Sequence, residues 1–296
     1  MLKIHNLHKS FGDKKVLKGL ELSVPKHSVF GFIGKNGAGK TTTMRTIMGL
    51  LMADEGDIFV ASEKVVYGNT KTNRHIGYLP DVPEFYSFMT AIEYLRFCGE
   101  ISGMDSTEIM PRSKELLELV GLEGEKHRIK GYSRGMKQRL GIAQALLNRP
   151  KLLICDEPTS ALDPLGRKEI LNILSTVKEN TTVLFSTHIL SDVERICTDV
   201  AFLNDGVISI QGKLSDIKSK YRSEEYMLET EKHEDTHKLM QTFPKLKVSG
   251  NNALRFNQKD YSPFEIIQFI ASNDIAFTKI EKLEPTLETL FMEVIK

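Results

Sequence analysis

The stretch VFGFIGKNGAGKTTTMRTIMG, residues 29–49, decides the fold of this chain. Its pattern predicts a short apolar strand, a glycine-rich turn and then a helix. The turn matches G-x-x-x-x-G-K-[ST] through Gly34, Gly39, Lys40 and Thr41. Glycines let the backbone come close to phosphate groups, and the N–H groups at the start of a helix attract negative charge. We therefore expect a loop that holds a nucleoside triphosphate.

Two side chains of this loop are expected to meet the phosphates and a metal ion. Lys40 would neutralise charge on the outer phosphates, and Thr41 would place its hydroxyl on Mg²⁺. The alternative is an ordinary glycine-rich turn between a strand and a helix. Because strand, turn and helix stand in the order that phosphate binding requires, we prefer the nucleotide-binding interpretation.

The composition is that of a globular protein with balanced charge. The 296 residues carry 40 Lys and Arg against 39 Asp and Glu, so no overall attraction to nucleic acid or anionic lipid is expected. Cys98, Cys155 and Cys197 lie far apart without metal-like spacing, which favours free, buried thiols in a reducing cytosol. We see no signal peptide and no stretch as long as a membrane span, so work at a membrane would require another chain.

Strands and helices follow one another in a regular order. Strands are expected at 2–8, 18–24, 29–33, 56–66 (a short antiparallel pair), 152–155, 182–187 and 200–204. Helices are expected at 40–50, over 90–120 with breaks near Gly103 and Pro111, before Pro150, at 165–179 and at 189–196, and Gly206 marks a hairpin turn. The alternation in the second half is typical of a parallel sheet covered on both faces.

We predict an α/β fold in two parts. Residues 1–213 would form a P-loop NTPase cassette with a parallel core sheet, an antiparallel β subdomain and a helical subdomain over about 82–148. Residues 214–296 would form a small α+β accessory domain, because strand-like MLETE and ALRFN alternate there with helix-like 232–242 and 263–272.

Two acidic residues end another predicted strand. LLICDEP places Asp156 and Glu157 at the carboxyl end of an apolar run, where ligands bind in parallel sheets. Asp156 suits hydrated magnesium, and Glu157 suits a general base that polarises an attacking water. His188 follows the next strand and would reach the terminal phosphate at the same sheet edge. The alternatives are two solvated loop acids and a structural histidine.

A second anion-binding cap is predicted in YSRGMKQR, residues 132–139, just before a helix. The backbone N–H groups around Ser133 and Gly135 would bind phosphate there. One nucleotide rarely needs two such caps, which hints at a site shared between two subunits.

These ordered motifs resemble the ATP-binding cassette (ABC) family, the nucleotide-binding subunits of transporters. Over roughly residues 1–213, GKNGAGKT resembles the Walker A motif, LLICDE the Walker B motif, YSRGMKQR the signature motif, SALD the D-loop and His188 the switch histidine. The resemblance implies ATP and Mg²⁺ as cofactors. The nucleotide-binding residues that it implies are Phe11, Gly34, Asn36, Gly37, Ala38, Gly39, Lys40, Thr41, Thr42, Ser133 and Gly135. The metal-binding residues are Thr41, Asp81 and Asp156, and the catalytic ones Glu157 and His188.

The family's mechanism would follow from this resemblance. Two cassettes close head to tail around two ATP molecules, each held between the Walker A motif of one subunit and the signature motif of the other. Phosphoryl transfer to water needs positioning and charge neutralisation, which the closed dimer completes. Closure and reopening would then move integral membrane permease subunits.

Several positions differ from the family pattern or have an alternative role. In the signature motif, Tyr132 replaces a leucine, Arg134 the first glycine and Met136 a glutamine, while Ser133 and Gly135 are kept, so we expect a competent site. Asp81 stands where the family has a glutamine that touches magnesium, and we expect it still to couple to Mg²⁺. Phe11 stands where the family stacks an aromatic ring on adenine, and its alternative role is that of a core phenylalanine.

Two further stretches point to a membrane partner and to export. VPEFYSFM, residues 82–89, is unusually apolar for a loop and lies where the family accepts a permease helix, although these side chains would equally pack the helical subdomain. The closing residues Pro285, Thr286, Leu287, Glu288 and Phe291 resemble a motif of cassettes that export drugs, peptide antibiotics or ions.

We therefore expect an ATPase subunit of an export complex. It would act as a dimer, with homodimer preferred, bound peripherally to the cytoplasmic face of the plasma membrane through its permease, without nucleic acid. The alternative is a soluble cassette ATPase of translation or DNA repair, which the single cassette and the lack of heptads or a basic arm disfavour. The sequence leaves the cargo and the role of the accessory domain open.

Overall fold

The computed structural model describes residues 1–220, 224–283, 286–288 and 290, and these fall into two compact units. The larger unit runs from Met1 to Asp216 and the smaller from Ile217 to Leu290. The strands are β1 (Leu2–Phe11), β2 (Lys14–Val24), β3 (Val29–Gly34), β4 (Glu55–Val60), β5 (Glu63–Lys64), β6 (Ile76–Leu79), β7 (Leu152–Asp156), β8 (Thr182–Thr187), β9 (Asp199–Asn204), β10 (Val207–Lys213), β11 (Glu225–Thr230), β12 (Lys247–Val248), β13 (Ala253–Asn257) and β14 (Phe277–Lys282). The helices are α1 (Lys40–Ile47), α2 (Ala91–Ile101), α3 (Ser106–Leu119), α4 (Arg134–Leu146), α5 (Pro164–Val177), α6 (Leu190–Ile196), α7 (Leu214–Lys220), α8 (His233–Thr242) and α9 (Pro263–Ser272), with 3₁₀ turns at Thr70–His75 and Ile129–Gly131.

A mostly parallel sheet forms the centre of the larger unit, as predicted. Its strand order is β10-β9-β3-β8-β7-β6, and only the edge strand β10 runs antiparallel to its neighbour. Every residue of β3, β7 and β8 is buried, which is why these strands read as apolar runs without alternation. Because β3, β7 and β8 are parallel, the residues that follow them meet at one edge of the sheet.

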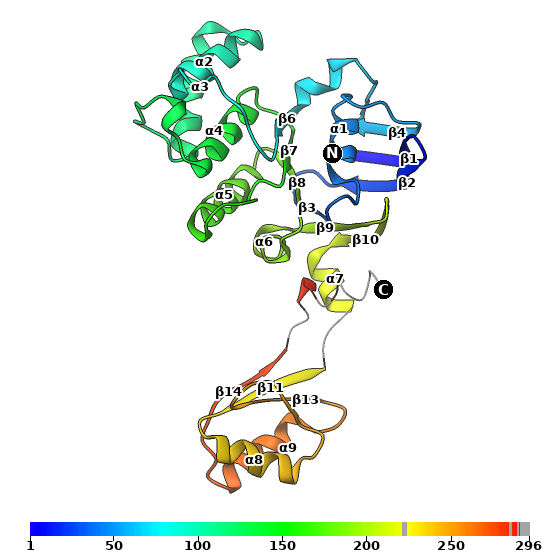
Figure 1. Cartoon of the computed structure of the whole chain (residues 1–296), viewed down its shortest axis with the longest axis vertical. Coiled ribbons are helices and arrows are strands. Elements are labelled where there is room, and N and C mark those ends of the chain that lie inside the picture. Colours follow the sequence, from blue (N-terminus) through cyan, green and yellow to red (C-terminus); the bar gives the residue numbers. More distant parts are fainter. Residues whose placement is uncertain (221–223, 284–285, 289, 291–296) are drawn as a thin grey trace. The chain divides into compact units, whose positions relative to one another are not determined.

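The amino-terminal strands form a second, antiparallel sheet in the order β2-β1-β4-β5. Helix α1 lies against both sheets: its Met44 and Ile47 join one buried cluster with Leu2 of β1 and Phe30 of β3. Figure 1 shows α1 beside β1 and β4. This packing fixes the start of α1, and therefore the glycine-rich turn, relative to the central sheet.

The opposite face of the central sheet is covered by α5 and α6. A side chain at Gly31 of β3 would lie 3.0 Å from Cys197 Sγ and 3.1 Å from Val193 Cγ1, so the absence of a Cβ lets α6 approach closely. Both faces of the sheet are thus covered by helices, as predicted.

The middle of the chain is helical, with one difference from expectation. The chain breaks at Gly103 between α2 and α3, but Pro111 lies inside α3 instead of ending it. Pro111 is exposed, as is Thr107, whose carbonyl loses its helical partner and can bond water instead. Together with α4, these helices lie at the end of the unit away from β1, β2 and β4 (Figure 1).

The smaller unit has the order β11-α8-β12-β13-α9-β14 around a sheet β12-β13-β11-β14, a split βαβ arrangement of the ferredoxin-like kind. Its core gathers Leu228, Leu239, Leu254 and Ile266, from both helices and two strands. The predicted strands and helices at MLETE, 232–242, ALRFN and 263–272 are confirmed, while β12 and β14 were not predicted.

Two remaining expectations concern the end of the chain and the membrane. Pro285 and Phe291, from the closing motif, lie outside the described residues, whereas Leu287 is buried. Within the described ranges no helix combines the length and the apolar character needed to cross a membrane.

Candidate functional site

The glycine-rich turn has a backbone that only glycine accommodates well. Gly37 and Gly39 have φ angles of +82° and +112°, in the region that side chains disfavour. A Cβ on Gly39 would also lie 2.8 Å from Leu17 Cδ2, and one on Gly34 would lie 2.8 Å from the Leu203 carbonyl oxygen. The turn therefore needs its glycines both for conformation and for space.

An open pocket of about 430 Å³ lies over this turn. It is lined by Lys14, Val16, Asn36, Gly37, Gly39, Lys40, Thr41, Thr42 and Glu157. Six of the predicted nucleotide-binding residues thus share one pocket, and Glu157 joins them from the end of β7. Gly34 and Ala38 belong to the same turn without lining the pocket.

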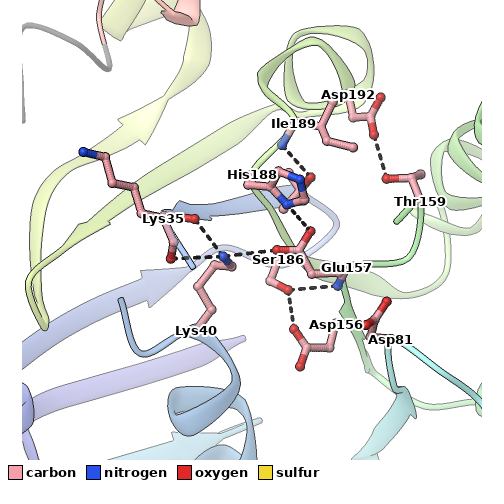
Figure 2. A network of polar contacts seen from close by, with 12 residues as sticks. Lys35, Lys40, Asp81, Asp156, Glu157, Thr159, Ser186, His188, Ile189 and Asp192 are labelled. Atoms are coloured by element: carbon pink, nitrogen blue, oxygen red, sulfur yellow. Dashed lines mark hydrogen bonds and ion pairs between the residues drawn. The ribbon is translucent and has the colours of Figure 1, made fainter. Parts of the chain in front are cut away.

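Lys40 is held in place by backbone carbonyl groups of the turn and by the side chain of Glu157, which follows β7. Its Nζ donates to the carbonyl oxygens of Gly34, at 2.7 Å, and Lys35, at 3.4 Å, and lies 3.1 Å from Glu157 Oε1. Lys40 is only 6% exposed and Glu157 15%, so the two charges neutralise each other largely away from water. Figure 2 shows Lys40 pointing toward Glu157, and the Lys35 side chain pointing away.

Glu157 also contacts His188. Its Oε2 lies 2.9 Å from His188 Nδ1 (Figure 2). The Glu157 backbone has a φ of +48°, a conformation that costs energy for a side chain other than glycine and that recurs at functional sites. The structure therefore brings Lys40, Glu157 and His188 together, as the sequence predicted, from β3–α1, β7 and β8.

The predicted metal ligands lie only partly together. Thr41 Oγ1 donates to Asp156 Oδ2 at 2.8 Å, so a hydroxyl and a carboxylate oxygen meet beside the pocket. Among the described residues, no three or more His, Cys, Asp or Glu side chains cluster as a metal site. Two oxygen donors beside a phosphate-binding loop suit Mg²⁺, which keeps several waters and takes further ligands from phosphates.

Asp81, the third predicted metal ligand, pairs with a cation. Its Oδ1 lies 3.6 Å from Arg134 Nη2, and its carbonyl accepts a 2.8 Å hydrogen bond from Gln138 Nε2. Asp81 follows β6 and Asp156 ends β7, and these are neighbouring parallel strands, so both lie at the same sheet edge. Two of the residues that depart from the family pattern, Asp81 and Arg134, therefore face each other.

Ser133 and Gly135 do not share the first pocket. Ser133 is the N-cap of α4, where its Oγ accepts from Met136 N at 3.2 Å. Both residues line a second pocket of about 340 Å³, together with Ala161, Leu162 and Asp163 of the SALD stretch. Within one chain, the two predicted phosphate-binding caps are thus separate.

Phe11 is not a core residue. It is 51% exposed at the end of β1, and Lys9 Nζ lies 5.5 Å from its ring centre. The lining of the first pocket does not include Phe11, but includes Lys14, its partner across the β1–β2 hairpin. The alternative role of a core phenylalanine is therefore wrong, and stacking on the base stays a prediction.

Sequence reasoning missed two buried polar residues beside the site. Ser186 Oγ donates to Asp156 Oδ1 at 2.6 Å, and Asp192 accepts from Thr159 Oγ1 at 2.7 Å (Figure 2). Arg167 Nη2 also donates to Asp192, at 2.6 Å. A sequence signal for Ser186 exists, since its hydroxyl directly follows the apolar residues Val183, Leu184 and Phe185 of β8.

Comparisons with known proteins identify the family of this chain. The family model described as ABC transporter matches residues 17–160. The ABC transporter ATP-binding protein YxlF of Bacillus subtilis is 44% identical over 77% of this chain and 76% of its own length. The bacitracin transport ATP-binding protein BcrA of Bacillus licheniformis is 34% identical over all of this chain and 97% of its own. The chain therefore belongs to the ATP-binding subunits of ABC transporters.

Solved structures show the same fold. A dimeric ATP-binding cassette in a post-hydrolysis state, bound to ADP and Pi, matches with a TM-score of 0.64 and 26% identity, over 72% of this chain and 99% of its own. Members of this family bind ATP and hydrolyse it to power transport, so the chain is an ATPase subunit of a transporter. Such subunits pair with one another and with membrane permeases. The alternative of a soluble cassette in translation or DNA repair is not supported.

Proposed function

We propose that the first pocket binds ATP with Mg²⁺ and that Glu157 is the general base for its hydrolysis. The observation that carries this is the contact of Glu157 with both Lys40 and His188 at the mouth of the phosphate-binding turn. Lys40 Nζ lies 3.1 Å from Glu157 Oε1. Arriving phosphate oxygens compete for Lys40 and release Glu157 Oε1 to accept a proton from water. His188 then holds the other carboxylate oxygen and faces the terminal phosphate.

Thr41 and Asp156 would hold the Mg²⁺. When bound, the ion neutralises phosphate charge during transfer. The two residues already meet through their 2.8 Å hydrogen bond, which supports the assignment. Phe11, exposed beside the hairpin that lines the pocket, would stack on the base, with Asn36, Gly37 and Thr42 around the phosphates.

Two copies of the chain would complete each site. In a single chain, Ser133 and Gly135 line a pocket separate from the one over Lys40. A second copy placed head to tail brings this cap to the phosphates of the first. The dimeric relative bound to ADP and Pi supports such pairing, and we take the dimer to be a homodimer.

The transporter would export its cargo through a separate permease at the cytoplasmic face of the membrane. Val82, Tyr86 and Phe88 are 62%, 51% and 61% exposed after β6, whereas Phe85 packs with its ring 5.1 Å from that of Tyr94. Tyr86 also packs against the helical subdomain, with its ring 5.5 Å from that of Phe97. The exposed three would receive an apolar permease helix. Alignment with BcrA along the whole chain favours a peptide antibiotic as cargo.

The hydrolytic assignment is tested with Glu157→Gln. Turnover should fall by about 10²- to 10⁴-fold because general-base catalysis is removed. ATP binding should persist and an ATP-bound dimer should accumulate on size-exclusion chromatography. The matched control is Glu179→Gln, an exposed acid beyond α5. Wild-type turnover by Glu157→Gln would show that another residue is the base.

The permease assignment is tested by copurification in mild detergent. Tyr86→Asp and Phe88→Asp should lose the membrane subunit while the isolated chain keeps its ATPase rate. Phe264→Asp, at an exposed phenylalanine of α9, is the matched control. A permease that stays bound to both loop variants and leaves with Phe264→Asp would place the contact on the accessory unit.

A further inference from the structure

We infer that Ser186 is a positioning residue for the hydrolytic reaction, acting through Asp156 and Glu157. This rests on the roles proposed above for those two acids. The Ser186 hydroxyl touches both of them: it donates to Asp156 Oδ1 at 2.6 Å and accepts from the Glu157 backbone N–H at 3.0 Å. One hydroxyl thus sets the orientation of the metal-binding carboxylate and of the backbone that carries the base.

The strand register places Ser186 for this task. Asp156 of β7 and Ser186 of β8 are direct partners in the parallel sheet. Ser186 is fully buried, with 0% exposure, so its hydroxyl must find partners inside the protein. Its two hydrogen bonds are those to Asp156 and Glu157.

The direction of each hydrogen bond follows from chemistry. A backbone N–H can only donate, so the Ser186 oxygen accepts from Glu157. The single hydroxyl proton must then go to Asp156 Oδ1, which therefore acts as an acceptor. Because Thr41 Oγ1 donates to Oδ2, the two Asp156 oxygens have separate tasks. Oδ1 is fixed to the sheet, and Oδ2 is turned toward the phosphate-binding turn.

The same hydroxyl supports the unusual backbone of Glu157. At a φ of +48°, this residue keeps its conformation only if its surroundings determine it. Its N–H meets both the Ser186 carbonyl oxygen, at 3.2 Å, and the Ser186 hydroxyl. This conformation directs the Glu157 side chain to Lys40 and His188 (Figure 2). Removal of the Ser186 hydroxyl takes away the hydrogen bond that fixes Asp156 Oδ1. It also takes away one of the two acceptors that hold the Glu157 backbone N–H.

The experiment compares Ser186→Ala with Thr181→Val. Thr181 is also buried, and its hydroxyl donates to the Pro150 carbonyl at 2.9 Å, away from both acids. Loss of a partner that orients a metal ligand typically costs 10- to 100-fold in metal affinity or activity. Ser186→Ala should therefore lower kcat roughly tenfold or more and raise the Mg²⁺ concentration for half-maximal activity, whereas Thr181→Val should change neither.

A binding measurement separates positioning from mere stability. In EDTA, the affinity of Ser186→Ala for a fluorescent ATP analogue should stay within about twofold of the wild-type value. In the presence of ADP, its affinity for Mn²⁺, measured by electron paramagnetic resonance, should fall roughly tenfold. If Ser186→Ala lowers only the thermal midpoint, as Thr181→Val does, and keeps kcat and Mn²⁺ affinity, the inference is overturned. Should Ser186→Ala be insoluble, Ser186→Cys is judged by the same measurements.

The outcome is distinguishable from failure of the proposed function. Glu157→Gln tests the base itself and does not alter the Ser186 hydroxyl. Wild-type turnover in Glu157→Gln would refute the assignment of the base, whatever Ser186→Ala does. Loss of turnover in Glu157→Gln with unchanged Mn²⁺ affinity and kcat in Ser186→Ala would refute only the role of Ser186.

Discussion

Asp81 Oδ1 and Arg134 Nη2 lie 3.6 Å apart, which joins the loop after β6 to the first turn of α4. A cation at the start of a helix opposes the helix dipole, and no acidic residue in that turn offsets it. Asp81 supplies the missing negative charge from another element. Asp81 and Arg134, which both depart from the family pattern, are thus complementary in charge.

This pairing predicts opposite effects on the metal requirement. Asp81→Asn removes a negative oxygen near the predicted metal site, so the Mg²⁺ concentration for half-maximal ATPase should rise. Arg134→Gln removes the competing cation, so that concentration should fall. Because exposed ion pairs contribute at most about 1 kcal/mol, neither change should lower the free energy of unfolding by more. If Asp81→Asn and Asp81→Gln both leave the Mg²⁺ dependence and the rate unchanged, Asp81 has no metal role.

Lys40→Ala should weaken ATP binding far more than Lys35→Ala. Lys40 Nζ is buried beside the pocket, and its charge-assisted hydrogen bonds to phosphate should contribute about 1.5–3 kcal/mol, or roughly 10- to 100-fold in Kd. Lys35 contributes only its backbone carbonyl to Lys40, while its side chain points away (Figure 2). Equilibrium binding of ATP decides, and equal losses in the two variants would contradict the assigned role of Lys40.

Phe11→Ala should weaken nucleotide binding without destabilising the fold. Stacking of aromatic groups contributes about 1 kcal/mol, so the Kd for ATP should rise roughly fivefold, and Phe11→Tyr should restore it. The side chain is half exposed, so the urea midpoint should change little. An unchanged Kd for ATP in Phe11→Ala would show that the adenine of ATP does not stack on Phe11.

The three thiols should resist alkylation in the folded protein. Burial raises the pKa of Cys98, Cys155 and Cys197 above the usual range for a thiol. A raised pKa lowers the thiolate fraction at any given pH, and the thiolate is the reactive form. At about pH 8, iodoacetamide should therefore modify the native chain slowly and the guanidinium-unfolded chain quickly. Fast labelling of native Cys155 would show that β7 opens readily.

Sequence patterns predicted most of the strands and helices, because the spacing of apolar residues along the chain reflects which residues are buried. The strands β3, β7 and β8 are buried throughout and mostly apolar. Helix α9 has the predicted bounds, since a serine cap and a proline mark its start. The helix over Pro111 was missed because the cost of proline depends on whether the orphaned carbonyl reaches water, which only packing decides.

Site residues that directly follow a strand could be predicted from the sequence. Site residues whose role depends on a partner from another element could not. Glu157 and His188 were found from their places after β7 and β8. Ser186 was not, because a hydroxyl in a strand shows its partners only once the register with β7 is known. The pairing of Asp81 with Arg134 likewise joins residues from separate elements, so neither residue's neighbours in the chain reveal it.

The separation of the two pockets within one chain has a genetic consequence. A copy with Lys40→Ala keeps the second pocket, around Ser133 and Gly135, intact. A copy with Gly135→Asp keeps the phosphate-binding turn intact. If sites form between copies, a mixed pair contains one fully intact site and one doubly damaged site. Two alleles that are each inactive alone would then complement each other when expressed together in one cell.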